Sequence, residues 1–428
     1  MVATETPDIH RTIDAVWRIE AAKLIAGLTR ITRDVGQAEE LAQDALEAAL
    51  RQWPQSGIPE KPGAWLMQSA KNRAIDGLRR RAMQQQKHAE IGRDLASREQ
   101  EMPDWDAALD DPVGDDVLRL IFTACHPVLS TEARTALTLR MVGGLATDEI
   151  ARAFLVAEAT MAQRIVRAKR ALSDAHVPFE VPRGTEMEAR LGSVLEVIYL
   201  IFNEGYTATA GADWVRPGLC DEALRLGRIL AELAPHEPEV HGLVALMEIQ
   251  ASRLHARVAP NGDPILLMDQ DRARWDHMLI RRGLAALDRA EREAAAHSIG
   301  LGPYALQAEI AACHARAHTA EETDWARIAL IYDALGHIAP SPVVELNRAV
   351  AVSMAEGPAA GLALIDALRD EPALKNYHLL PGVRGDLLFK LDRKAEAKVE
   401  FQRAATLTRN ERERQLLMKR AEECKATP

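Results

Sequence analysis

Residues 38–50 of this chain read AEELAQDALEAAL. The apolar residues recur at intervals of three and four, which places them on one face of an amphipathic helix. These residues are Ala38, Leu41, Ala42, Ala45, Leu46, Ala49 and Leu50. The opposite face carries Glu40, Gln43, Asp44 and Glu47. The stretch therefore predicts a helix with one apolar face and one acidic face.

The composition extends this prediction to the whole chain. Hydrophobic residues make up 47% of the 428 residues, but there are only six Phe, seven Trp and five Tyr. Alanine and leucine are favourable in helices, whereas sheets prefer β-branched and aromatic residues. We therefore expect an all-α protein and not an aromatic-poor β-sandwich or barrel. The formal charge of −10 argues against a generally basic surface but does not exclude a local one.

Breaks in the helical periodicity predict four parts. We expect a small helical domain over residues 10–82 and a second one over residues 115–175, joined by a flexible linker over residues 83–114. A long helical extension follows over residues 188–428. The linker is rich in Gln, Asp and Pro, a composition typical of flexible segments. Within the extension, segments that begin at Gly357 and Arg393 lie 36 residues apart. This spacing is close to the period of about 34 residues of tetratricopeptide repeats, so it indicates a helical-repeat array.

The same sequence gives expectations about compartment and cofactors. No run of apolar residues is long enough for a transmembrane helix, and the acidic N-terminus does not resemble a secretory signal. The four cysteines lie far apart, without the spacing of a zinc site or of a disulfide scaffold. They are Cys125, Cys220, Cys313 and Cys424. We expect a cytoplasmic protein that has no membrane association, metal site or cofactor.

The clearest local motif is a helix-turn-helix between Leu137 and Leu172. Its second helix places Met161, Ile165, Ala168 and Leu172 on one apolar face that packs inward. The outward face then carries Thr160, Gln163, Arg164, Arg167, Lys169 and Arg170. Residues 152–170 hold five basic and one acidic residue, so a basic helix is available for the major groove. Gln and Arg can contact base edges, and the last basic residues can contact phosphates. The alternative is a helix hairpin with a solvated basic face.

A second basic segment covers residues 61–98, with nine basic and three acidic residues. Phosphate contacts and base stacking are the two usual means of binding single strands. The candidate residues are Trp65, Lys71, Asn72, Arg79 and Arg80. In the alternative interpretation, Trp65 is a core aromatic residue and the arginines stabilise the C-terminal end of a helix.

Taken in order, these elements resemble a bacterial RNA polymerase sigma factor of the extracytoplasmic-function type over roughly residues 10–175. Residues 38–46 are similar to the helix that binds the polymerase core, with Leu46 where an aromatic residue is usual. Residues 64–80 are similar to the segment that melts and reads the −10 element. Residues 149–169 resemble the helix-turn-helix that reads the −35 element, with Ala162 where a basic or polar residue is common. The stretch from Phe122 to Gly144 further resembles a subgroup with a C-terminal helical-repeat extension.

The resemblance implies roles and partners. Core polymerase would bind Glu39, Glu40, Gln43, Asp44 and Glu47, and promoter DNA would bind the two basic segments. The extension would act as a regulatory element, through a regulatory protein or through an intramolecular contact. This implied function is transcription initiation without enzymatic activity.

Two other interpretations stay open at this stage. A helix-turn-helix regulator with a sensory helical domain would act without polymerase core. An enzyme has little support, because the chain lacks a phosphate-binding glycine loop and a His-Glu-x-x-His zinc motif. Two polar groups could line a pocket, although helix ends and solvated turns explain them equally well. They are Asn203, Glu204 and Tyr206, and Asp269, Asp271 and Asp276.

Overall fold

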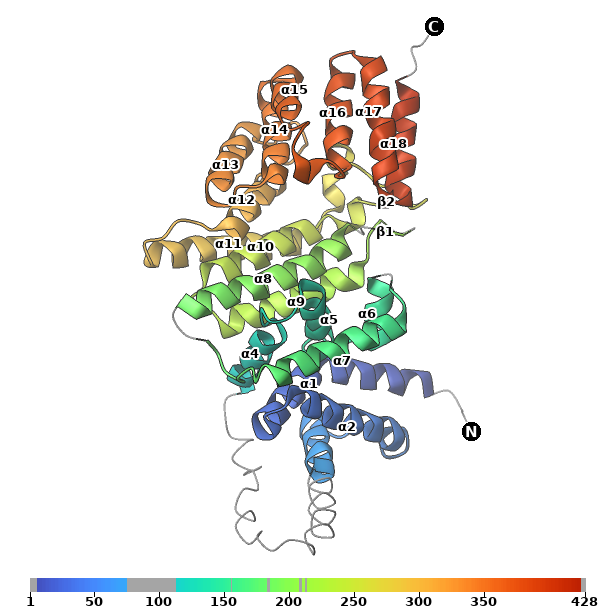
Figure 1. Cartoon of the computed structure of the whole chain (residues 1–428), viewed down its shortest axis with the longest axis vertical. Coiled ribbons are helices and arrows are strands. Elements are labelled where there is room, and N and C mark those ends of the chain that lie inside the picture. The colour runs from blue at the N-terminus through green and yellow to red at the C-terminus, as the bar shows by residue number, and fades with distance from the viewer. Residues whose placement is uncertain are drawn as a thin grey trace, which may run out of the picture. The chain divides into compact units, whose positions relative to one another are not determined.

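The structure is a computed structural model that describes residues 6–74, 113–154, 156–182, 185–207, 210–211 and 214–424 (Figure 1). Within these residues the chain is almost entirely helical, which confirms the all-α prediction. It divides into two compact units, Met1–Val197 and Ile198–Pro428. The predicted linker lies almost wholly outside the described residues. Arg79 and Arg80 lie entirely outside them. The four predicted domain boundaries stay predictions.

The first unit contains the two segments that carry the sequence motifs. Its helices are α1 (Thr6–Thr32), α2 (Val35–Ser56), an unlabelled helix over residues 62–74, α4 (Val113–Ala124), α5 (Thr131–Met141), α6 (Thr147–Ala153), α7 (Glu158–Asp174) and the first part of α8 (Thr185–Tyr206). Helix α1 packs against α2, α4 and α5, and α7 packs against α2, α5 and α6. The helices before and after residues 75–112 therefore form one packed body.

Helix α2 shows how the local sequence produces the fold. The Asp34 carboxylate caps the helix by accepting a hydrogen bond of 2.8 Å from the backbone N–H of Gln37. The buried residues of this helix are five alanines, Glu39 and Trp53, while the leucines of the predicted stripe are only half-buried. These leucines are Leu41, Leu46 and Leu50. Small buried residues allow neighbouring helices to approach closely. The predicted stripe is therefore correct for its four alanines, whereas its three leucines are not fully buried.

The second unit is a succession of helices in which most consecutive members pack against each other. Its long helices after α8 are α9 (Pro217–Leu233), α10 (Pro238–Ala251), α11 (His277–Ala296), α12 (Pro303–Arg316), α13 (Trp325–Ile338), α14 (Pro342–Glu356), α15 (Pro358–Ala367), α16 (Leu379–Lys390), α17 (Lys394–Leu407) and α18 (Glu411–Glu423). The short elements are β1 (Ala210–Gly211), β2 (Arg409–Asn410), and the 3₁₀ turns η2 (Leu254–Ala256), η3 (Leu267–Asp269), η4 (Arg272–Arg274) and η5 (Pro372–Leu374). Strand β1 pairs with β2 in parallel.

Several helices of this unit begin at a proline. Helices α9, α10, α12, α14 and α15 each have a proline in the first turn, where its missing N–H costs no hydrogen bond. Helices α15 and α17 begin at Pro358 and Lys394, which reproduces the 36-residue spacing of the sequence. The identity of the repeat as tetratricopeptide-like stays a prediction.

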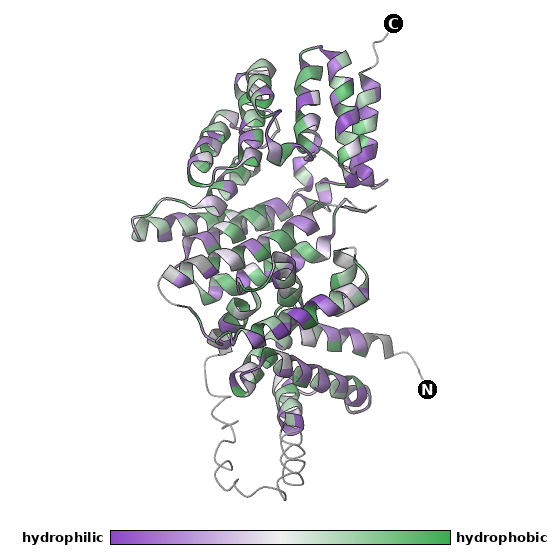
Figure 2. Ribbon diagram, in the orientation of Figure 1, coloured by the Kyte–Doolittle hydropathy of each residue, from purple (hydrophilic) through white to green (hydrophobic). Residues whose placement is uncertain are grey.

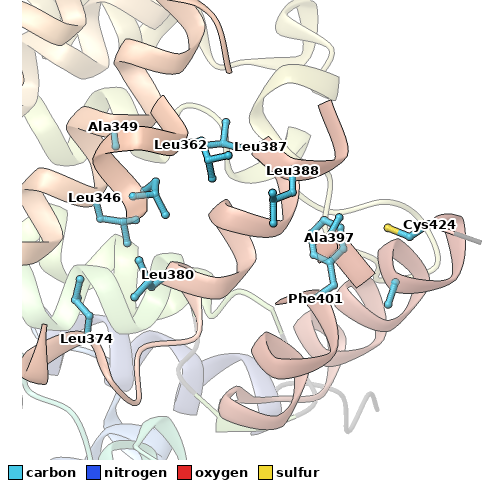
Figure 3. Close-up of a cluster of buried hydrophobic side chains, with 12 residues drawn as sticks. Leu346, Ala349, Leu362, Leu374, Leu380, Leu387, Leu388, Ala397, Phe401 and Cys424 are labelled. Atoms are coloured by element: carbon cyan, nitrogen blue, oxygen red, sulfur yellow. The ribbon is translucent and has the colours of Figure 1, made fainter. Parts of the chain in front are cut away.

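Aliphatic packing stabilises the C-terminal end of the second unit. Leu346, Leu362, Leu387 and Phe401 belong to one buried cluster that joins α14 through α18 (Figure 3). Gly385 lies so close to the Phe401 ring that a Cβ there would come within 2.9 Å of it. Close helix contact thus requires glycine at this position.

Candidate nucleic-acid interface

Helix α7 presents the predicted basic face. Its apolar residues Met161, Ile165, Ala168 and Leu172 are all buried, as the periodicity predicts. On the other side, Thr160, Gln163, Arg167 and Arg170 are exposed and Arg164 is half-exposed. Hydrophilic residues dominate the visible face of α7 (Figure 2). Five of the six residues predicted to contact the −35 element are therefore accessible to a partner.

Lys169, the sixth of these residues, does not face outward, so its predicted exposure is wrong, while its contact with DNA stays a prediction. Its Nζ lies 2.9 Å from the Glu39 carboxylate of α2, and its side chain is only 16% exposed. Along α7, Lys169 follows Ile165 by four residues and precedes Leu172 by three, which places it at the edge of the buried stripe. The neighbouring helix α2 then covers it.

Glu39 is the buried centre of this contact. Its side chain is 6% exposed, and its carboxylate also lies 2.8 Å from a guanidinium nitrogen of Arg140 on α5. Glu39 is therefore not presented to a partner, which corrects its placement on the surface for core polymerase. Two cations compensate one buried carboxylate here, and breaking such a pair typically costs about 3–5 kcal/mol.

The remaining acidic residues of α2 stay at the surface. Glu40 and Glu47 are exposed, and Gln43 and Asp44 are half-exposed. Asp44 pairs with Arg73 of the helix over residues 62–74 at 3.1 Å. This pair joins the acidic face of α2 to the first part of the second basic segment.

Two tryptophans attach the helix over residues 62–74 to α2. Trp53 is fully buried, and its ring meets that of Trp65 edge to face at a centroid distance of 5.3 Å. Trp65 is half-buried, so its ring belongs partly to the core and partly to the surface. Asn72 is exposed and accepts a hydrogen bond of 2.9 Å from Gln68, while Lys71 is half-buried. Trp65 is thus partly a core aromatic residue and partly a surface ring that a base can reach.

Further contacts between α1 and the helix-turn-helix were not predicted from the sequence. The Trp17 indole donates a hydrogen bond of 3.1 Å to the carbonyl of Gly144, and Arg18 pairs with Glu149 at 2.9 Å. Gly144 has a φ of +69°, and a Cβ there would contact Ala21 and Trp17. A glycine at this turn permits both the left-handed backbone and the close approach of α1.

The described residues contain no group of three His, Cys, Asp or Glu residues that could hold a metal ion. All four cysteines are buried and unpaired, and burial raises the pKa of the Cys125 thiol to about 11. No helix among the described ranges has the length and apolar character needed to span a membrane.

Comparisons with known proteins match three parts of the chain. Residues 19–83 match the model for sigma-70 region 2, and residues 119–172 match the model for sigma-70 region 4. Residues 190–291 match a family of unknown function, DUF6596. An uncharacterized protein of Rhizobium meliloti (strain 1021) is 46% identical over 388 residues, which cover 90% of this chain and 89% of that protein. No solved structure matches the chain.

Proposed function

Because this chain belongs to the extracytoplasmic-function-like sigma factors with a C-terminal extension, we propose that it directs core RNA polymerase to promoters through their −10 and −35 elements. Sigma factors are non-enzymatic transcription proteins, and both DNA-binding regions match their family models. The exposed polar face of α7, on a helix-turn-helix, is the observation that carries the proposal. Run-off transcription with purified core polymerase tests it.

Helix α7 would enter the major groove at the −35 element. Gln163 and Arg167 are exposed on one face and have the chemistry to contact base edges. Thr160, Arg164 and Arg170 lie around them and would contact phosphates or further bases. Lys169 joins this set only when its pair with Glu39 opens.

Arg167→Ala should weaken binding to a −35 duplex by about fivefold or more, since one good base contact is worth about 1–3 kcal/mol. Fluorescence anisotropy with the full-length protein measures this affinity at fixed salt. Arg51→Ala is the matched control, because Arg51 is an exposed helical arginine whose described partner is Glu47 on its own helix. Equal losses in the two variants, or none in Arg167→Ala, would remove Arg167 from the reading face.

The helix over residues 62–74, continued by Arg79 and Arg80, would engage the −10 element. Trp65 offers part of an aromatic face for stacking, and Asn72 offers an exposed amide. Lys71, Arg79 and Arg80 would neutralise phosphates, so binding should weaken with salt. On α2, the surface residues Glu40, Gln43, Asp44 and Glu47 would dock on core polymerase, with Glu39 added when its pairs open.

Promoter binding requires the two regions to separate. The −10 and −35 elements lie about 25 base pairs apart, which is roughly 85 Å of duplex at 3.4 Å per base pair. In the described structure α7 contacts α2 directly, through Lys169 and Glu39. We therefore propose that the packed arrangement is a resting state and that α7 leaves α2 when holoenzyme forms on a promoter.

The C-terminal extension would regulate this activity in the cytoplasm, through a partner protein or through an intramolecular contact. A truncation that tests this role should end after Val197, because α8 contributes to the first unit. There, Ser193 donates to the carbonyl of Cys125 at 2.9 Å and Arg190 to that of Phe122 at 3.0 Å. We expect truncated protein to lose condition-dependent control of promoter output in cells. Equal output from both proteins across growth conditions would contradict a regulatory role.

A further inference from the structure

Half of the unsatisfied buried polar atoms lie in one part of the second unit. Twelve buried side-chain N and O atoms in the described chain have no hydrogen-bond partner, and six of them belong to a single connected group. We call this group the arginine–aromatic cluster; it consists of Tyr206, Arg253, Arg257, Arg272, Trp275 and His314. Such a concentration requires an explanation, because an unpaired buried polar group costs about 1–3 kcal/mol.

Cation–π contacts connect five of the six residues, all except His314. The Arg257 guanidinium lies 3.7 Å from the centroid of the Tyr206 ring. The Arg253 guanidinium lies 5.7 Å from the centroids of both Tyr206 and Trp275, and that of Arg272 lies 5.1 Å from Trp275. The six residues come from the end of α8, the turns after α10, and α12. The fold thus brings together residues up to 108 positions apart in the sequence.

Two of the three arginines are held by backbone carbonyls at helix ends. Arg257 donates to the carbonyl of Tyr206 at 3.1 Å, and Arg272 donates to the carbonyls of His314 and Ala317 at 2.7 and 2.8 Å. The Arg253 side chain has no hydrogen bond or ion pair to any described residue. It is half-exposed, while its Nε is buried and unpaired. Of the three arginines in this cluster, Arg253 therefore has the most unused hydrogen-bond donors.

The cluster also lacks a nearby negative charge. Within the described residues, no carboxylate lies within 4 Å of any of the three guanidinium groups. Glu321 and Glu322 act on Arg272 only from a distance and are exposed, and Glu204 is paired with Arg216. Burial, followed by the charges of Arg253 and Arg272, lowers the pKa of His314 to about 3, so this imidazole is neutral at pH 7. Three like charges without a counter-ion are unfavourable in a partly buried site.

We propose that the arginine–aromatic cluster binds the anionic group, a carboxylate or a phosphate, of a small molecule. The unpaired Tyr206 hydroxyl, Trp275 indole N–H and arginine Nε–H groups are all able to donate hydrogen bonds, and an anion supplies the missing acceptors. The planar guanidinium of Arg253 suits carboxylate and phosphate oxygens alike. All members except His314 lie within residues 190–291, the region that matches the family of unknown function. The proposal therefore assigns an anionic small molecule as the ligand of this region.

Isothermal titration calorimetry of the full-length protein tests the site, with inorganic phosphate and acetate as separate probes at constant ionic strength. Arg253→Gln should weaken binding of at least one probe by about tenfold or more, as expected for a charge-assisted hydrogen bond. The control is Arg281→Gln, because Arg281 is an exposed arginine of α11 in the same unit. The probe that binds distinguishes a carboxylate ligand from a phosphate ligand. Phosphate that binds the basic face of α7 is unaffected by either substitution, so only the difference between the two variants is informative.

Tyr206→Phe provides a second test that preserves the ring contacts. Without a ligand, this variant should stay folded with a thermal stability close to that of the wild type, because the ring and its contacts with Arg253 and Arg257 remain. Its affinity for the same probe should fall. Affinities for both probes that match the wild type in Arg253→Gln and Tyr206→Phe would overturn the proposal.

Discussion

Glu39→Gln should release α7 from α2 and so increase −35 DNA binding by the free protein about tenfold or more. The neutral amide leaves Arg140 and Lys169 facing each other without the carboxylate that compensates both. Breaking a buried ion pair costs about 3–5 kcal/mol, and opening the contact relieves this cost by solvating the two cations. Separation also frees Lys169 for phosphate contact.

Two measurements check this prediction. Hydrogen exchange should accelerate at the start of α2 and at Gly144, where α1 meets the helix-turn-helix. Fluorescence anisotropy with a −35 duplex should show the gain in affinity without core polymerase. Glu47→Gln is the control, since Glu47 is exposed on the same helix. Unchanged exchange and affinity in Glu39→Gln would mean that the Glu39 contacts do not hold a resting state.

Trp53→Ala should lower the free energy of unfolding of the first unit by about 3–5 kcal/mol, the usual cost of removing a fully buried aromatic side chain. Trp53 is 1% exposed and supports Trp65 on the adjacent helix. Loss of this support should impair −10 binding more than −35 binding, because α7 does not contact Trp53 through any described interaction. Urea denaturation and separate −10 and −35 binding assays measure the two effects.

Trp53→Phe is the matched control, since it keeps an aromatic ring in the same core position. It should retain most of the stability and most of the −10 binding. If Trp53→Ala leaves −10 binding intact while the protein remains folded, the tryptophan pair does not position the −10 helix.

The local sequence predicts helices well because periodicity reports directly on the buried face. The apolar stripe of α7 and the proline-marked helix starts of the second unit follow from short-range patterns. Lys169 could not be placed in this way, since Glu39, which covers it, lies 130 residues away in the chain. A single helix shows which side is polar but not which neighbouring helix covers its edge.

The same limit applies to the other long-range contacts. The hydrogen bond from Trp17 to Gly144 joins residues 127 apart, and neither residue alone predicts it. Tyr206 is recognisable in the sequence as part of a polar group that could line a pocket. Its arginine neighbours come from turns that only the folded chain brings together, so the positive charge of that site could not be predicted.

The most direct test of the central claim is run-off transcription with purified core polymerase and a promoter bound by the holoenzyme. The account predicts a product that requires this protein and disappears when either the −10 or the −35 element is scrambled. DNA binding that persists without a promoter-dependent product would contradict it and would instead support a helix-turn-helix regulator that acts without polymerase core.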